Sequence, residues 1–469
     1  MCSGWFLLCT TSCRKLPNKM GWQARGSPFM TYQPMYTSFL LGREFLDFQD
    51  FFTLQAIVGC FRSQSSCGGT MDAHHEQEAA CRETSGREQS SDWQKKVESL
   101  ACRYITAEEL LHFYASLGSP QVMPHYDPEQ HTMNDIVRAA IIPKSVISGG
   151  ERGLSYADVL QRRRRSHLQL AEPGAGTPHS PPVEDGLDDG RVCAQRMVTH
   201  EWSSLFVHTV AAVLADALNQ DQYGPIAQTI QTEVGIDRVM RRLRRRQALH
   251  TRYWICAFCV NQHLTICNGF PPEPPRDSPE WLRFQAHACD SLTLQRHPCC
   301  ACSEPKCWEG DHSETNKFDD IMKLLSLRVP SLRQVVAIDR NFNLFSRVWC
   351  VAELVQAHQS NIDQNVCLMW RRSLDANTGD VGTYLKLATL SVSDCSAARA
   401  EDKDRILHKI RATCGIPEFD ARLQSTIFGD NGLLGKDLVG FDVIYAAARA
   451  AMRVKVAAAQ VEQAQAAHV

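Results

Sequence analysis

Apolar runs of strand length alternate with helical patterns from about residue 191 onward. Tyr253–Val260 has no polar residue apart from cysteine, which predicts a strand that is buried on both faces. The five apolar runs are Cys193–Thr199, Tyr253–Val260, Val335–Asp339, Val366–Trp370 and Leu387–Val392.

Helical patterns lie between these runs. Ser203–Leu218 repeats apolar residues every three or four positions, and Ser203 is its expected N-cap. Phe318–Leu327 is a short amphipathic pattern, and Ser346–His358 is another, with Ser346 as its expected cap. Strands and helices in alternation predict an α/β fold with a parallel sheet and helices on both faces.

Composition and pattern divide the chain into five parts. They are an irregular region at 1–95, a small helical region at 96–170, a linker at 171–190, the α/β region at 191–395 and a helical C-terminal extension at 396–469. The first 70 residues lack periodicity, so Met71 is a candidate for the true start. Residues 401–413 and the alanine-rich stretch 441–467 predict helices in the extension.

The helices of the 96–170 region have clear end signals. Residues 105–118 predict a helix whose N-cap is Thr106, and Glu109 completes a capping box. A second helix is predicted at Thr132–Ile142, before a proline, and a third begins near Ser155. Because these helices lack an apolar core of their own, we expect them to pack on the α/β region.

Charge and cysteine content exclude several classes of protein. Lys plus Arg is 50 and Asp plus Glu is 52, so the net charge of −2 gives no general attraction to nucleic acid. Many of the 20 cysteines lie in apolar runs, which indicates buried thiols and a cytoplasmic location. No apolar run is long enough to predict a membrane span. The basic run Arg162–Arg165 is interpreted as a nuclear signal or a partner contact, and Arg241–Arg246 as a solvated helix face.

Two predicted strands end in distinctive polar sequences. The first is Val198-Thr-His-Glu-Trp202, directly before a helix. The second is the end of the predicted strand Val335–Asp339. A loop follows it and leads into the helix start Ser346-Arg-Val-Trp-Cys-Val-Ala-Glu-Leu354. That helix start resembles the Ser-x-x-Trp-Cys-x-x-Glu-Leu pattern of plant TIR domains, and the Val198–Trp202 strand end is similar to the opening TIR strand. The chain also resembles protist proteins that combine such a sheet with cysteine-rich inserts.

The resemblance implies a flavodoxin-like sheet of five parallel strands and an activity on NAD. In catalytic TIR domains the glutamate that matches Glu353 acts in the release of nicotinamide, where a carboxylate stabilises the positive charge that builds on the ribose. The same resemblance and the placement at strand ends suggest the substrate-binding residues, which are His200, Glu201, Trp202, Asp339, Arg340 and Trp349.

Each of these residues also has a purely structural interpretation. A glutamate in the second turn of a helix is usually solvated and stabilised by the helix dipole. Trp349 and Cys350 could be core residues, and His200 and Glu201 could be satisfied polar groups of a loop.

The long loop at 264–315, called the insert below, concentrates histidine and cysteine. Cys299-x2-Cys302 has the spacing of a zinc knuckle, and Cys289 and Cys307 could complete four ligands. Zinc would stabilise a loop without its own apolar core. The earlier Cys256–Cys259 pair, which His263 and Cys267 follow, is a weaker candidate, because thiols two apart in a strand would point to opposite faces.

Three functions therefore remain open from the sequence. The first is a TIR-like enzyme that cleaves NAD with Glu353. The second is a non-catalytic TIR-like module that binds itself or another TIR-like partner. The third is a metal-stabilised scaffold built around the insert.

Overall fold

The structure is a computed structural model. It describes residues 90–147, 152–170, 192–270, 272–370, 387, 389–429 and 432–434. All of these belong to one compact unit, Cys67–Val469. The predicted helix at 441–467, the linker at 171–190 and the first 70 residues lie outside the described residues.

A five-stranded sheet forms the centre of the unit. Its strands are β1 (Ile105–Thr106), β2 (Arg196–Thr199), β3 (Arg252–Ile255), β4 (Arg333–Ala337) and β5 (Asp363–Cys367), in the order β1-β3-β2-β4-β5. The pairs β2–β3, β2–β4 and β4–β5 are parallel, as predicted. The pair β1–β3 is antiparallel, so the expectation of a purely parallel sheet is wrong at this edge.

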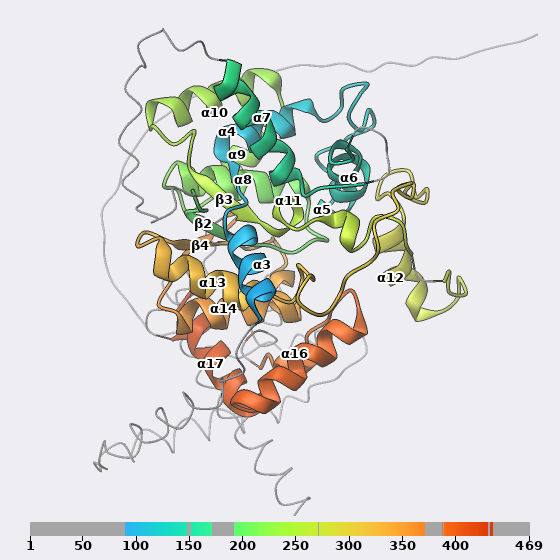
Figure 1. The fold of residues 1–469 in the computed structure, drawn as a ribbon, viewed down its shortest axis with the longest axis vertical. Coiled ribbons are helices and arrows are strands. Elements are labelled where there is room, and N and C mark those ends of the chain that lie inside the picture. The colour runs from blue at the N-terminus through green and yellow to red at the C-terminus, as the bar shows by residue number, and fades with distance from the viewer. Residues whose placement is uncertain are drawn as a thin grey trace, which may run out of the picture. The chain divides into compact units, whose positions relative to one another are not determined.

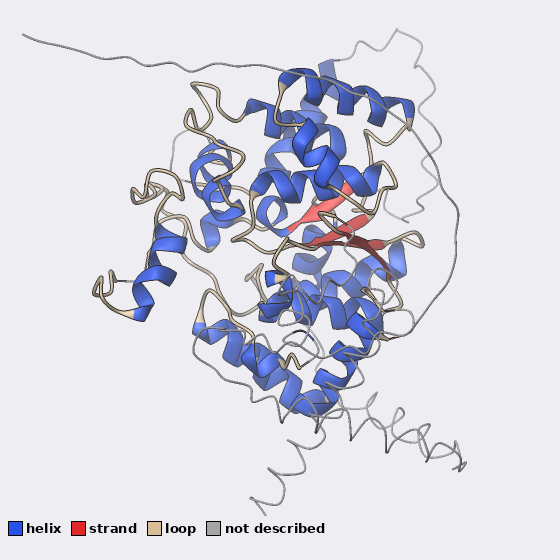
Figure 2. Cartoon of the chain, turned by 180° about the vertical axis from the view of Figure 1, so that it is seen from behind, coloured by secondary structure: helices blue, strands red, loops and turns tan. Residues whose placement is uncertain are grey.

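Helices cover both faces of the sheet, as the alternating pattern predicts (Figure 1). One face carries α4 (Ala107–Ser116), α8 (Phe206–Ala217), α9 (Gly224–Thr229) and α10 (Glu233–Arg245). The other face carries α3 (Ser91–Ala101), α13 (Phe318–Arg328) and α14 (Val348–Gln359). Figure 2 shows the strands between these two helical layers from behind. The fold is therefore a three-layer α/β arrangement.

Strand alternation divides the apolar residues between two cores. Val335 packs with α8, whereas its neighbour Val336 packs with α14 on the opposite face. In the same way Val198 packs with α8, and Met197 packs with α3 and α13. This alternation decides which strand-end side chains face α14.

The remaining elements flank the sheet. They are α5 (Met133–Ile136), η1 (Val137–Ile141), α6 (Ile142–Lys144), α7 (Tyr156–Leu170), α11 (Cys256–Cys259), η2 (Gln262–Leu264), α12 (Pro279–Ala288), η3 (Asn343–Ser346), η4 (Val392–Asp394), α16 (Ala400–Thr413) and α17 (Ile416–Phe428). The insert lies to one side with α12 (Figure 1). No helix among the described residues is long and apolar enough to cross a membrane.

Two predicted strands are wrong in part or whole. The described residues of Leu387–Val392 do not form a strand. Their apolar side chains instead fill the core beside α14 and α17. Tyr253–Val260 is a strand only to Ile255, after which the buried turn α11 continues the apolar run. A short apolar run does not distinguish a strand from a buried helical turn. The strand predicted at Val366–Trp370 begins earlier, at Asp363, since it pairs through polar residues at an edge.

Helix ends differ from the sequence prediction at three places. Helix α8 begins at Phe206 without a side-chain cap, because the Ser203 hydroxyl donates to the Glu201 carboxylate instead. Helix α14 begins at Val348, and the Ser346 hydroxyl donates to a carbonyl within η3. The helix predicted to end before Pro143 continues to Lys144, since a π turn in η1 precedes the proline.

The Thr106 capping box is confirmed. The Thr106 hydroxyl accepts from the Glu109 backbone N–H at 3.2 Å, and the Glu109 carboxylate accepts from the Thr106 backbone N–H at 2.9 Å. The helix predicted at 401–413 is also confirmed, as α16. Local signals therefore specified the start of α4, whose capping side chain keeps its hydrogen bond within the first turn.

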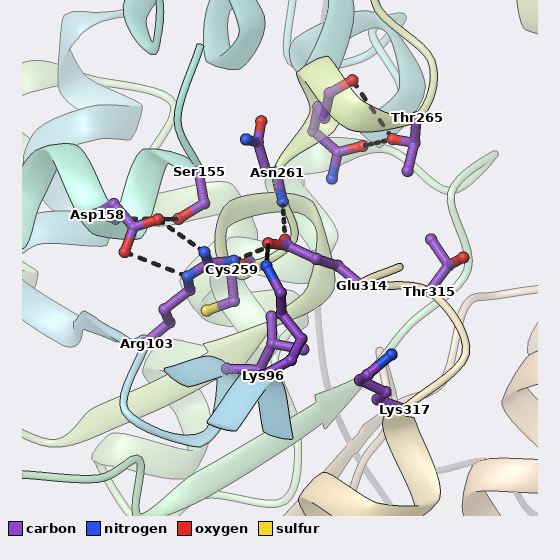
Figure 3. Close-up of polar contacts among 12 residues, drawn as sticks. Lys96, Arg103, Ser155, Asp158, Cys259, Asn261, Thr265, Glu314, Thr315 and Lys317 are labelled. Atoms are coloured by element: carbon purple, nitrogen blue, oxygen red, sulfur yellow. Dashed lines mark hydrogen bonds and ion pairs between the residues drawn. The ribbon is translucent and has the colours of Figure 1, made fainter. Parts of the chain in front are cut away.

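A buried ion-pair cluster joins three parts of the chain that are distant in sequence (Figure 3). The Arg103 guanidinium, after α3, contacts the Glu314 carboxylate at 2.6 Å and the Asp158 carboxylate of α7 at 3.0 Å. Glu314, at the end of the insert, also accepts from the Asn261 backbone N–H at 2.7 Å. The cluster therefore fixes the N-terminal helices and both ends of the insert to the sheet.

Candidate functional site

The carboxyl ends of β2 and β3 meet the first turns of α14. Ligands bind at such strand ends in open parallel sheets. The segment Thr199–Trp202 leaves β2 at this edge, and α14 supplies Cys350 and Glu353 from the facing layer. We call these residues, together with Cys256 of α11, the strand-end cluster.

Glu353 is held against the sheet by a chain of hydrogen bonds. The Thr199 hydroxyl donates to the Glu353 carboxylate at 2.6 Å and accepts from the Gln334 amide at 2.7 Å. The Gln364 amide continues the chain by donating to Gln334 at 2.7 Å. Burial raises the pKa of Glu353 to about 7, although the Thr199 hydrogen bond acts in the opposite direction. The carboxyl group is therefore oriented rigidly and titrates near neutral pH.

His200 and Cys256 form the neutral part of the cluster. The Cys256 sulfur lies 3.9 Å from His200 Nε2 and accepts from the Trp202 indole N–H at 3.3 Å. Burial lowers the pKa of His200 to about 4 and raises the pKa of Cys256 to about 12. Both groups are neutral at pH 7, so the pair lacks the thiolate that nucleophilic cysteine chemistry requires.

Glu201 points to the loop rather than to Glu353. Its carboxylate accepts from the Ser203 hydroxyl and lies 3.6 Å from the Arg347 guanidinium. Arg347 is the N-cap residue of α14. Glu201 therefore connects the end of β2 to the start of α14, which positions the helix that carries Glu353.

The other predicted site residues divide between the two faces of the sheet. Trp349 lies one turn before Glu353, and its ring packs 5.4 Å from the ring of Phe318. Asp339 follows β4 on the face of Val335, where its carboxylate accepts from the backbone N–H groups of residues 341 and 344 at 2.9 Å. Arg340 is exposed. The structure therefore places Glu353 against Thr199 and near Cys256, whose sulfur His200 and Trp202 contact, whereas Trp349 packs on Phe318. Asp339 has a loop-stabilising role.

Four members of this environment were not among the predicted site residues: Thr199, Gln334, Cys256 and Cys350. Gln334 is a fully buried amide at the second position of β4, directly before its apolar residues. A polar residue at that position was visible in the sequence, and it is the signal that could have indicated a polar strand face toward α14. Cys256 gave no such signal, because its place depends on the helical turn of α11.

Within the described residues, three groups of side chains could hold a metal ion. One group consists of His263, Cys267, Cys300 and Cys302. Of the four zinc ligands predicted in the insert, only Cys302 belongs to it. The predicted set is wrong in its other members: Cys289, Cys299 and Cys307 fall in no such group of the described chain.

The other two groups share Asp290. One contains His125, His131 and Asp290, and the other contains Asp135, Asp290 and His297. His125 Nε2 lies 3.0 Å from the Asp290 carboxylate, and His297 Nε2 lies 3.1 Å from the Asp135 carboxylate. Both carboxylates also accept hydrogen bonds from backbone N–H groups. Hydrogen-bonded histidine–carboxylate pairs therefore explain the short distances within these two groups.

Two cavities border α7, away from the strand-end cluster. The larger, with a volume of about 780 Å³, lies between α3 and α7 and includes Arg164 and Arg165 in its lining. The smaller, of about 310 Å³, includes Arg162 and Arg163. The Arg164 guanidinium is paired with the Glu109 carboxylate at 2.5 Å, so part of the basic run is structural.

Comparison with known proteins gives no further identification. No family model matches the chain, and neither a curated protein nor a solved structure matches it.

Proposed function

We propose that residues 191–395 form a TIR-like domain that cleaves NAD at the nicotinamide N-glycosidic bond, with Glu353 as the key carboxylate. The observation that carries the proposal is the position of Glu353, whose carboxylate is fixed to the end of the first parallel strand by Thr199 at 2.6 Å. The order of the four parallel strands supports it. Counted along the chain, β3-β2-β4-β5 is 2-1-3-4, the order in which a flavodoxin-like sheet begins.

The chemistry of the bond requires a carboxylate rather than a carboxylic acid. As the nicotinamide leaves, positive charge develops on the ribose, and an ionised carboxylate stabilises that charge. Because the pKa of Glu353 is about 7, its ionised fraction rises with pH through neutrality. Turnover should therefore increase as the pH rises from 6 to 8. His200 and Trp202, whose side chains contact the Cys256 sulfur of the same cluster, are the residues proposed to contact the ribose and the nicotinamide.

The test is nicotinamide release from NAD by the full chain. Glu353→Gln preserves the acceptor for Thr199 and removes the charge, and we expect it to reduce turnover at least about 100-fold. Exposed Glu129→Gln is the matched control and should leave turnover unchanged. The assay should extend to high protein concentration, because TIR-like domains often act as assemblies. No turnover in the wild-type chain, or equal turnover in Glu353→Gln, would contradict the proposal.

A second function, a non-catalytic interaction module, is favoured by one observation. The insert exposes three large apolar side chains, Leu282, Leu292 and Leu294, with exposed fractions of 71%, 43% and 61%. A contiguous apolar patch marks an association surface, and these three side chains are the candidates for one in the insert. Sedimentation velocity over a concentration series would test this function. Self-association that Leu282→Asp abolishes would support it, and a strict monomer would contradict self-association.

A further inference from the structure

Three cysteines of the insert and His263, directly before it, come together as possible metal ligands, and they are not the four that the spacing within the insert suggests. We propose that His263, Cys267, Cys300 and Cys302 bind one structural zinc ion. The sulfur atoms of Cys267 and Cys302 are 3.4 Å apart, and the Cys300 sulfur lies 3.6 Å from His263 Nδ1. All four ligand atoms lie within 4.8 Å of one another.

These separations can be compared with a zinc tetrahedron. Bonds of about 2.3 Å to sulfur and about 2.0 Å to nitrogen give sulfur–sulfur edges of about 3.8 Å and nitrogen–sulfur edges of about 3.6 Å. The Cys300–His263 separation matches its edge, and the Cys267–Cys302 separation is slightly shorter than its edge. Because all four ligand atoms already lie within 4.8 Å of one another, we expect side-chain rotations to complete the tetrahedron.

Backbone hydrogen bonds hold the two ligand-bearing segments together. The Cys300 N–H donates to the Cys267 carbonyl at 2.9 Å, and the Cys307 N–H donates to the Leu264 carbonyl at 2.8 Å. One segment supplies ligands four residues apart, His263 within η2 and Cys267 after it, and the other supplies ligands two residues apart. The site is thus formed by tertiary contact between residues 263–267 and 300–302.

The side chain of His263 is oriented as a metal ligand. Its Nε2 lies 3.0 Å from the Ser145 hydroxyl, which donates its only proton to a helix carbonyl, at 2.8 Å from that of Ile141. With that proton on the carbonyl, the hydroxyl oxygen can accept from Nε2–H, and the proposed site takes the tautomer whose Nδ1 lone pair is free for the metal. Outer hydrogen bonds of this kind fix the tautomer of metal-bound histidines. Gly153 permits the arrangement, because a Cβ there would lie 2.0 Å from the His263 ring.

The charges around the four ligand side chains favour a bound zinc ion over free thiols. Three thiolates and a neutral histidine around Zn²⁺ carry one net negative charge. The Lys306 ammonium lies 3.0 Å from the Cys267 sulfur and donates to the His263 carbonyl at 2.5 Å. His263, Cys267 and Cys302 are at most 5% exposed, so this cation would neutralise the complex inside the protein.

The position of the group explains what the metal would do. Within the insert, Cys267 and Cys302 are the members of the main apolar core beside α8. A loop with so little apolar burial gains stability from a closed four-ligand zinc site. Because residue 263 follows β3 and α11 closely, the metal would also fix the loop at the carboxyl edge of the sheet.

The experiment measures zinc in the full chain, purified under reducing conditions without chelator. Elemental analysis should find that Cys300→Ser holds one zinc ion fewer per chain than the wild type. Cys289→Ser, Cys299→Ser and Cys307→Ser are matched controls in the same insert, and each should hold as much zinc as the wild type. Wild-type protein without zinc, or zinc lost from a control but kept by Cys300→Ser, would overturn the proposal.

A second measurement on the wild-type chain does not depend on how a variant folds. Zinc is exchanged for Co²⁺, and the absorption spectrum is recorded. A tetrahedral cobalt spectrum with charge-transfer intensity for three thiolates is the expected result. An octahedral spectrum without thiolate charge transfer would overturn the proposal. A disulfide between Cys267 and Cys302 in reduced-purified protein, found by mass spectrometry, would overturn it as well.

Discussion

In the wild-type chain, ionisation of Glu353 should lower the free energy of unfolding as the pH rises, and replacement of Glu353 by glutamine should remove this loss. The carboxyl group has a pKa of about 7 when folded, against an ordinary value of 4.5, because it is buried against the sheet. Glutamine has a similar shape, retains an oxygen that can accept from Thr199, and carries no charge at any pH. The variant therefore isolates the cost of ionising this one group.

The sign and size follow from the two pKa values. Below pH 4.5 the group is protonated in both the folded and the unfolded chain, so its stabilising contribution is fully present. As the pH rises to 7 the unfolded chain releases this proton first, and stability falls by about 1.4 kcal/mol per pH unit. The difference between 4.5 and about 7 gives a total loss of about 3 kcal/mol, which is complete above pH 7.

Urea unfolding at pH 5 and pH 8 measures this loss. The stability of Glu353→Gln relative to the wild type should increase by about 2–3 kcal/mol between the two values of pH. Every other titrating group is shared by both proteins, so it cancels in the comparison. The exposed control Glu129→Gln should show no such increase. If Glu353→Gln and the wild type lose stability equally between pH 5 and 8, the carboxyl group is not buried as described here.

Three further changes test other parts of the structure. Arg103→Met leaves the buried Glu314 carboxylate without its guanidinium and should destabilise the chain by about 3–5 kcal/mol in urea unfolding, with partial recovery when Glu314→Gln is added. Gly153→Ala places a Cβ 2.0 Å from the His263 ring, and we expect this overpacking to lower the stability of the chain by about 1–3 kcal/mol in thermal unfolding. Elemental analysis should also find less zinc in this variant. Thr106→Ala removes a confirmed capping box and should cost about 1 kcal/mol in urea unfolding; an unchanged midpoint would show that the cap contributes little.

The periodicity of the sequence determined the α/β class, the parallel strands at β2, β3 and β4, and most of the helices. These features depend on local repeats of 2 and 3.6 residues, which a single sequence displays directly. The capping box at Thr106 is specified in the same way, since both partners lie within one turn. Local signals misled where a neighbouring group competed for the capping side chain, as when the Glu201 carboxylate accepted from the hydroxyl of Ser203.

The identity of the sheet's fifth strand was decided by tertiary structure alone. The two-residue strand β1 is too short to produce a pattern, and it exists because Ile105 pairs with Tyr253 of β3. The apolar run at Leu387–Val392 had strand-like composition, but its described residues fill the core between α14 and α17. Burial explains an apolar residue equally well in a strand, a turn or a helix.

The sequence identified the residue types at both candidate sites, and tertiary structure decided their grouping. The motif around Glu353 indicated a functional carboxylate. Only the alternation of side chains along the strands put Thr199 on the same face of the sheet as Glu353 and Asp339 on the opposite face. Spacing favoured zinc ligands close together in the insert, since knuckle patterns are local. The group in the structure instead joins His263 and Cys267 to cysteines more than 30 residues away, as backbone pairing between the two segments requires. A long-range pairing of this kind leaves no periodic trace in the sequence.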